Sequence, residues 1–398
     1  MSRYINYIVA YIVGSLFLLS QIQMLHVYIL HYVAIVICIA YTAVSIYANG
    51  INKHNNGHLL VYFILICFIS IFMNNIPLAF KPVERFVVFV LVLLATSSII
   101  ENDRVRVFRL ILTKVLLQMM LVLSIFSTFA YYVGFVLPNS TNNVYYGLVH
   151  HSNVLGPISA MSILYLIHLS NRTKLKLILK IVCIPLCFVS LLLSSSRAAI
   201  VACALGLFCY LFILYRHRFS RLVLILMMII TGAIVTFPLY KDAVVGLQNK
   251  MNYGKEKGSS IASRDKLWST RIDEFVSSPV YGIGFNTVSD KSELELSKDM
   301  VRVESGSAYL GLLSMTGILG FLFCVSYIIK VIINCFRLAM RRINNIRALL
   351  LSLTIFFACH IVFEAYLTTV GWILMIVFWL CFACAELPDK YIIDKEEL

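Results

Sequence analysis

Long apolar segments alternate with short polar ones along almost the whole chain. A helix needs about 20 apolar residues to cross the hydrocarbon core of a bilayer, and most of these segments are near that length. The strands of a membrane β-barrel would give shorter segments that are apolar only at every second position. The pattern therefore predicts an all-α, polytopic membrane protein with about twelve spans. The predicted spans are 5–22, 26–47, 59–73, 84–100, 110–136, 153–170, 178–194, 197–215, 222–239, 306–330, 348–365 and 367–385.

One long polar segment interrupts this pattern between the ninth and tenth predicted spans. The chain is thereby divided into three parts: 1–239, 240–304 and 305–398. Within the polar segment, apolar residues such as Leu267, Ile272 and Phe275 recur at nearly helical spacing, so a short helix lying on the membrane is expected there. Because the segment is the only extended polar part of the sequence, it is the first place to look for chemistry.

Composition agrees with this pattern. Hydrophobic residues make up 61% of the chain, charged residues 13%, and the mean hydropathy is +0.89. The net charge is +14. In a soluble protein this excess would suggest a nucleic-acid partner, but Lys and Arg also gather in the cytoplasmic loops of membrane proteins. The latter explanation is sufficient, and no nucleic-acid partner is expected.

The basic residues between the spans predict an orientation. Five short basic segments fall on one face of the predicted arrangement: Lys53, 104–109, 172–176, 216–221 and 337–347. The Lys/Arg bias makes this face cytoplasmic, and both termini join it. The polar segment 240–304 then lies on the opposite face, because the rule applies to short loops more than to long ones.

The cysteines and histidines give little sign of a metal or redox centre. All eleven cysteines lie outside 240–304, mostly within apolar segments. Cys381 and Cys384 have the spacing of a metal-binding pair, but they lie in a predicted span, where packing is the better interpretation. The adjacent His150 and His151 diverge and suit a shared metal poorly. We therefore expect no disulfide, thiol catalysis, metal or cofactor.

The first candidate for chemistry is the step Ser194-Ser195-Ser196-Arg197 between two spans. An arginine at membrane depth is costly and needs a partner or a wet cavity. Arg197 lies on the face without the basic loops, so a functional role is one interpretation. The other is an arginine that extends along the helix end to reach water.

The polar segment adds Arg264, Trp268 and Arg271 as candidates for ligand contact. Arg264 either faces a ligand or is a solvated arginine paired with Asp265. A second motif in the segment is the turn at 279–286 with two glycines. It lacks the strand and helix of a dinucleotide site, so we expect it to shape the backbone rather than to bind a ligand.

Glu304 ends the polar segment just before the span that contains Tyr309, which is a candidate for substrate contact. One interpretation is a general base whose pKa is set by burial and by nearby arginine. The alternative is a carboxylate that only stabilises the helix N-terminus through the helix dipole.

Other polar residues on the same predicted face are weaker candidates. His150, His151 and Asn153 are candidates for substrate contact. Arg85 follows Glu84 at the start of a span, and the two are interpreted as an ion pair at the point where the chain enters the membrane. Glu364 lies inside a predicted span, so it needs a partner and is a candidate to reach the same cavity.

The order of these motifs resembles the O-antigen ligase and Wzy-type polymerase superfamily of bacterial envelope glycosyltransferases. The matching pieces are HHSNVLG at 150–156, SSSRAA at 194–199, SRDKLW at 263–268, SPVYGIGFN at 278–286 and ESGSAYLGLLSMTGILG at 304–320. The resemblance covers about residues 140–330 by motif and the whole chain by topology. It implies a GT-C-like, multi-pass protein of the bacterial inner membrane with its active site on the periplasmic face.

The resemblance also implies a reaction. A glycan passes from undecaprenyl diphosphate to an acceptor hydroxyl without a metal or cofactor. Arg197 and Arg264 match the family's two arginines, which are thought to engage the diphosphate, and Arg85 is a candidate helper. Two guanidinium groups can bind phosphate oxygens in a fork and stabilise charge on the departing diphosphate. The implied partners are the lipid-linked donor and acceptor, membrane lipids and, as a candidate, a chain-length regulator.

The chain departs from the family pattern at one position. Many members, the ligases especially, have His-Asn where this chain has Glu304-Ser305. A glutamate can still take a proton from a sugar hydroxyl, so the departure favours a repeat-unit polymerase over a ligase that transfers glycan to lipid A-core or protein. A transporter of lipid-linked sugars is a weaker alternative, because the spans carry few charges and no internal repeat is visible.

Overall fold

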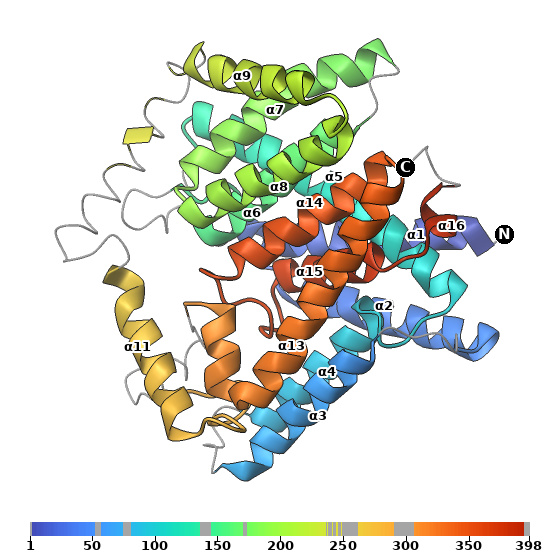
Figure 1. Ribbon diagram of the computed structural model, residues 1–398, viewed down its shortest axis with the longest axis vertical. Coiled ribbons are helices and arrows are strands. Elements are labelled where there is room, and N and C mark those ends of the chain that lie inside the picture. The colour runs from blue at the N-terminus through green and yellow to red at the C-terminus, as the bar shows by residue number, and fades with distance from the viewer. Residues whose placement is uncertain are drawn as a thin grey trace.

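The computed structural model describes residues 2–51, 57–74, 81–135, 145–169, 173–235, 262–289 and 306–393, with isolated positions between 237 and 248. Every regular element in this part of the chain is a helix (Figure 1). The helices are α1 (Ser2–Gln21), η1 (Gln23–Leu25), α2 (Ile29–Asn49), α3 (His58–Met73), α4 (Pro82–Thr96), α5 (Asp103–Tyr132), α6 (Ser152–His168), α7 (Lys174–Leu193), α8 (Arg197–Tyr215), α9 (Phe219–Val235), α11 (Ala262–Ser277), α13 (Ala308–Arg341), α14 (Asn345–His360), α15 (Ile373–Ala385) and α16 (Asp389–Ile393). The all-helical prediction is therefore confirmed for the described residues.

Each predicted span coincides with one of these helices. Only some of the helices are long and apolar enough to cross a membrane. Six helices are long and apolar enough to cross a bilayer by length and composition: α1, α2, α5, α7, α8 and α13. Four apolar helices are shorter: α3, α6, α14 and α15. A multi-pass membrane protein is thus supported, while the number twelve stays a prediction.

Two helices extend beyond their predicted boundaries into charged sequence. α5 begins at Asp103 rather than near 110, because the Asn102 side chain accepts a hydrogen bond from the Val105 amide at 2.8 Å and caps the helix. α13 continues to Arg341 rather than ending near 330. Hydrophobicity marks the membrane-length part of a helix, whereas the cap marks where the helix begins.

α15 is the central helix of the bundle. All its residues are buried, including the aromatic side chains of Phe378 and Trp379. A helix that is apolar on every side is expected in the interior, because it has no face suited to water. Around it, α14 packs along α8, α1 along α5, and α3 along α13.

α13 is bent, and the glycine turn after α11 packs into the bend. Gly317 has φ 63°, which an L side chain rarely adopts, and it interrupts the helical backbone. The Ile318 amide donates to the Pro279 carbonyl at 2.8 Å, and the Ile283 amide donates to the Ser314 carbonyl at 2.8 Å. The turn therefore satisfies backbone groups that the bend frees, as the sequence predicted for a turn that shapes the backbone.

Three arginines close helix C-termini at one end of the bundle, here named the arginine-capped end. Arg109 donates to carbonyl oxygens at the end of α4 at 2.9 and 3.0 Å. Arg347 donates at 3.0 and 2.8 Å to carbonyl oxygens at and just beyond the end of α15. Arg216 donates at 3.0 and 2.7 Å to the end of α13. The last carbonyls of a helix have no intrahelical partner, so these arginines satisfy groups that would otherwise be costly to bury.

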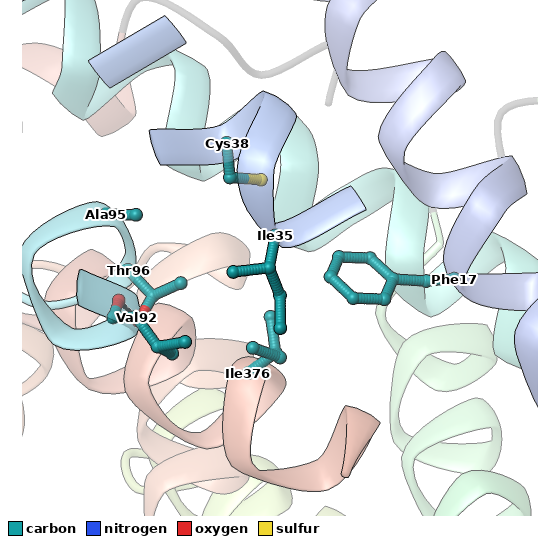
Figure 2. A pocket seen from close by; sticks show the side chains of 7 residues that line it. All are labelled: Phe17, Ile35, Cys38, Val92, Ala95, Thr96 and Ile376. Atoms are coloured by element: carbon teal, nitrogen blue, oxygen red, sulfur yellow. Dashed lines mark hydrogen bonds between the residues drawn. The ribbon is translucent and has the colours of Figure 1, made fainter. Parts of the chain in front are cut away.

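A narrow gap between α1, α2, α4 and α15 is apolar (Figure 2). It is lined by Phe17, Ile35, Cys38, Val92, Ala95, Thr96 and Ile376. The Thr96 hydroxyl already donates to the Val92 carbonyl at 2.7 Å. The gap therefore presents little that a charged or polar substrate could bind, and the polar candidates lie elsewhere.

Candidate active site

Glu364 brings together two elements that are far apart in the sequence. It lies between α14 and α15 and is only 7% exposed. Its Oε1 accepts a hydrogen bond from Arg264 Nη2 of α11 at 2.6 Å, and its Oε2 accepts one from Asn153 Nδ2 of α6 at 3.2 Å. A buried carboxylate is costly unless it is paired and hydrogen-bonded, and here both conditions are met. We name Asn153, Arg264, Gly306 and Glu364 the Glu364 site.

The backbone of this segment also holds the start of α13. The Ala308 amide donates to the carbonyl oxygens of Ile361 at 2.9 Å and of Glu364 at 3.2 Å. The first amides of a helix lack intrahelical partners, so the segment after α14 caps α13 through its carbonyls. α6, α11, α13 and the α14–α15 connection therefore meet at Glu364.

Arg264 and Trp268 explain the Arg-xxx-Trp motif, because both bind one carbonyl. They lie four residues apart, on the same face of α11. Arg264 Nη1 donates to the Gly306 carbonyl at 2.8 Å, and Trp268 Nε1 donates to the same oxygen at 3.2 Å. Gly306 has φ +65°, and a Cβ there would lie 3.3 Å from Trp268 Nε1. A glycine is therefore needed to bring this carbonyl under both side chains.

Arg197 begins α8 beside the helix that carries Asn153. The preceding Ser195 adopts φ 51°, which turns the chain sharply between α7 and α8. A Cβ on Gly156 of α6 would lie 2.7 Å from the Ser196 Cβ, so α6 and this step are in close contact. Gly156 follows Asn153 by three residues and shares its face of α6. The half-buried Arg197 thus begins α8 against α6, the helix that carries Asn153.

The two adjacent histidines have protein partners. His151 caps α6, and its Nδ1 accepts from the Asn153 amide at 3.0 Å. His150 Nε2 lies 3.1 Å from the Ser20 carbonyl, and its Nδ1 lies 3.4 Å from the Tyr28 hydroxyl. Burial lowers the pKa of His150, which favours the neutral ring. Both histidines fix the start of α6, and their contact with substrate stays a prediction.

Arg271 lies in an interior ion pair, away from the Glu364 site. Its side chain is 0% exposed, and Nη1 lies 3.0 Å from Oε2 of Glu274, which is one helical turn further along α11. Glu274 also accepts from the Ser289 amide at 2.7 Å and from the Ser314 hydroxyl at 2.5 Å. These contacts attach α11 to α13, and the ligand contact predicted for Arg271 stays a prediction.

The remaining described candidates lie near helix starts. The Tyr309 hydroxyl donates to the Ala358 carbonyl at 3.1 Å and so links α13 to α14. Arg85 is half-buried in the first turn of α4. Its neighbour Glu84 forms an exposed ion pair with Lys81 at 3.4 Å, so the expected pairing of Glu84 with Arg85 is replaced by one at helical spacing. Glu304 lies outside the described residues.

The sequence predicts that Glu364 is a buried carboxylate that needs a partner, but it does not place Glu364 among the catalytic and substrate-binding residues. Its partners lie 100 and 211 residues away along the chain. The presence of a carboxylate in an apolar segment is the sequence signal that could have placed Glu364 among the predicted site residues, since such groups are paired or functional. Which arginine it meets is set by the packing of α11 and α14 and has no local signature.

Comparison with known proteins gives a family match for one part of the chain. A family model described as O-antigen ligase matches residues 181–325. The matched range contains the serine–arginine step, α11, the glycine turn and the first part of α13. No curated protein sequence matches the chain. Over residues 181–325 the match confirms the resemblance that the motifs indicate, and it supports the O-antigen ligase and polymerase superfamily.

Proposed function

We propose that this protein is a polymerase of lipid-linked oligosaccharide repeat units. It transfers a glycan from undecaprenyl diphosphate to a sugar hydroxyl of another lipid-linked repeat, at the periplasmic face of a bacterial inner membrane. The family match supports a glycosyltransferase-like membrane enzyme of the O-antigen ligase type. The replacement of His-Asn by Glu304-Ser305 favours polymerisation over ligation.

The observation that carries the proposal is the Arg264 guanidinium, which the Glu364 carboxylate and the Gly306 carbonyl hold in place. A guanidinium has five N–H donors, and Arg264 uses two of them on Gly306 and Glu364 among the described residues. The others remain available for phosphate oxygens, and the side chain is 24% exposed. A held but partly open arginine suits an anion that must bind, change charge and leave.

The proposed reaction is a single displacement. The acceptor hydroxyl oxygen forms a bond to the anomeric carbon, and the bond from that carbon to the diphosphate oxygen breaks. The hydroxyl proton passes to the Glu304 carboxylate. Arg264 and Arg197 stabilise the negative charge that develops on the departing undecaprenyl diphosphate, which is an electrostatic role that fixed donors perform well.

The direct test is to incubate the purified protein with a synthetic undecaprenyl-diphosphate-linked repeat unit and to separate the products by size. A ladder of multiples of the repeat is expected. Arg197→Ala should abolish the ladder, while Arg218→Ala, an exposed arginine at the arginine-capped end, should preserve it. A normal ladder from Arg197→Ala would contradict the role of that arginine.

A ligase of the same superfamily is the second candidate, because the matching family model is described as O-antigen ligase. Loss of the gene separates the two. Cells without a polymerase still attach single repeat units to the final acceptor, whereas cells without a ligase attach none. A chain-length regulator is a further proposed partner, and it would change the length of the ladder rather than its presence.

A further inference from the structure

We propose that Glu364 is a positioning residue for the transfer reaction: its carboxylate holds the Arg264 guanidinium in the orientation that binds the donor diphosphate. The inference rests on the proposed function. It adds a residue that lies outside the matched family range of 181–325. It also gives Asn153 a place in the same machinery, as the residue that holds the second carboxylate oxygen.

The depth of the two side chains supports this role. The Glu364 side chain is 9% exposed and the Arg264 side chain 24%. The carboxylate therefore lies on the inner side of the guanidinium, and the more open side remains for a ligand. A long, flexible arginine loses rotamer freedom when it binds an anion, and a partner that fixes it beforehand reduces that cost.

Both oxygens of the carboxylate have a donor. Oε1 accepts from Arg264 at 2.6 Å, and Oε2 accepts from Asn153 at 3.2 Å. A general base needs an oxygen within hydrogen-bond reach of the proton that it removes. Both oxygens thus hold neighbouring side chains, which suits Glu364 for orienting a cation, and the proposed reaction assigns proton removal to Glu304.

A second ion pair on α11 offers a matched comparison. Arg271 and Glu274 lie 3.0 Å apart, and their side chains are 0% and 1% exposed. Both side chains are buried in this arrangement, and the pair attaches α11 to its surroundings. The Arg264–Glu364 pair differs in having one partner open to the outside, which is what a positioning role requires.

The test compares two substitutions of Glu364 in the purified polymerase. Gln keeps an oxygen that accepts from Arg264, and its amide can pair with a flipped Asn153. Ala removes the acceptor. We expect Glu364→Ala to lower kcat by about 100-fold, which is the loss typical of a misplaced catalytic group. The kcat of Glu364→Gln should be about tenfold higher than that of Glu364→Ala. The fraction of folded protein is measured in parallel by thermal unfolding.

Three further measurements distinguish positioning from other roles. The Glu364→Gln variant should keep the acidic limb of the wild-type pH–rate profile, because proton removal belongs to another group. In an Arg264→Lys background, Gln and Ala at 364 should no longer differ, because lysine lacks the planar fork that the carboxylate orients. Glu274→Gln should lower stability and leave the kcat of the folded protein unchanged.

The outcomes separate this inference from the proposed function. If the wild type forms a ladder and the Gln and Ala variants at 364 are equally inactive or equally active, the positioning role is wrong and the polymerase stands. A difference that persists with Lys at 264 would contradict action through the guanidinium. If the wild type forms no ladder, the proposed function is overturned together with this inference.

Discussion

The arginines at the two ends of the bundle are satisfied in different ways. At the arginine-capped end, Arg109 and Arg347 are almost completely buried and donate mainly to backbone carbonyls of helix C-termini. At the Glu364 site, Arg264 is partly open and is held by one carboxylate and one carbonyl. Figure 1 shows α11, which carries Arg264, well apart from α16, whose Asp389 accepts a hydrogen bond from Arg347 at the arginine-capped end.

The difference shows how to separate structural from functional arginines in a membrane protein. A guanidinium surrounded by carbonyls cannot bind an anion without breaking the helix ends that it closes. A guanidinium with an exposed side and few partners can bind one while its anchors stay in place. Sequence alone places Arg109 and Arg347 at span boundaries and Arg264 in the polar segment, and the type of partner that each arginine binds distinguishes their roles.

The largest expected effect is on activity at the Glu364 site. Arg264→Ala should reduce ladder formation by about 1,000-fold or more, because it removes a preorganised donor to the leaving diphosphate. The midpoint of thermal unfolding should also fall, because the buried Glu364 carboxylate loses its cationic partner, so activity is expressed per amount of folded protein. The initial rate of product formation measures the first expectation. An active Arg264→Ala variant would contradict the proposal that the arginine at the Glu364 site is functional while those at the arginine-capped end are structural.

At the arginine-capped end the expected effect is on stability. Arg347→Ala leaves carbonyl oxygens at the end of α15 without a donor, and it removes the 2.7 Å contact with Asp389. Unsatisfied buried acceptors cost about 1–3 kcal/mol each, so a loss of about 3 kcal/mol in the free energy of unfolding is expected. Unfolding in detergent measures the loss. The activity of the folded fraction should equal that of the wild type.

A smaller effect is expected where the backbone supports Arg264. Gly306→Ala places a Cβ at φ +65° and 3.3 Å from Trp268 Nε1, so it strains the backbone and displaces the shared carbonyl. We expect about a tenfold loss of activity, equivalent to about 1.4 kcal/mol, within the range of such strain. Gly134→Ala is the control, because Gly134 has φ +77° and nothing within 4 Å of its Cβ position. If both variants lose activity equally, the carbonyl has no special role.

Asn153→Ala removes one neutral donor from Glu364 and leaves Arg264 in place. A single hydrogen bond of this kind contributes about 1 kcal/mol, so about a fivefold loss of activity is expected. Steady-state kinetics measure it. Asn153→Asp should be worse than Asn153→Ala, because it places a second carboxylate against Glu364. The reverse order would show that Asn153 acts on something other than this carboxylate.

The smallest effect concerns pH and His150. Its pKa is lowered in the folded protein, so the unfolded chain binds a proton more readily than the folded one. The stability that neutral His150 contributes is therefore present above the ordinary histidine pKa of about 6.5 and decreases as the pH falls below it. His150→Gln should reduce this slope, as measured by unfolding between pH 7 and pH 5. An unchanged slope would remove His150 from the structural support of α6.

Helices were predictable because their apolar length is a local property of the sequence. Long-range partners were not. The partner of Arg271 is an exception, because Glu274 lies at a helical spacing that the sequence already shows, and the ligand contact predicted for Arg271 stays a prediction. The sequence predicts that Glu364 needs a partner, which the structure confirms, but Arg264 and Asn153 reach it only through the packing of α11 and α6 on the bundle. The individual residues of the site could therefore be predicted from the sequence, whereas the contacts between them could not.

The hydrogen bonds between the glycine turn and the bend of α13 fix the length of the connection that follows α11. Ile283 and Ile318 each donate across this junction, at 2.8 Å in both cases. One residue inserted or deleted between 278 and 284 would shift the register of both bonds and rotate α11 about its own axis. Arg264 would then turn away from Glu364 without any change to either side chain. Tags and epitopes for locating the protein in cells therefore belong outside 278–284, and natural relatives that share the mechanism should hold this spacing constant even where their residues differ.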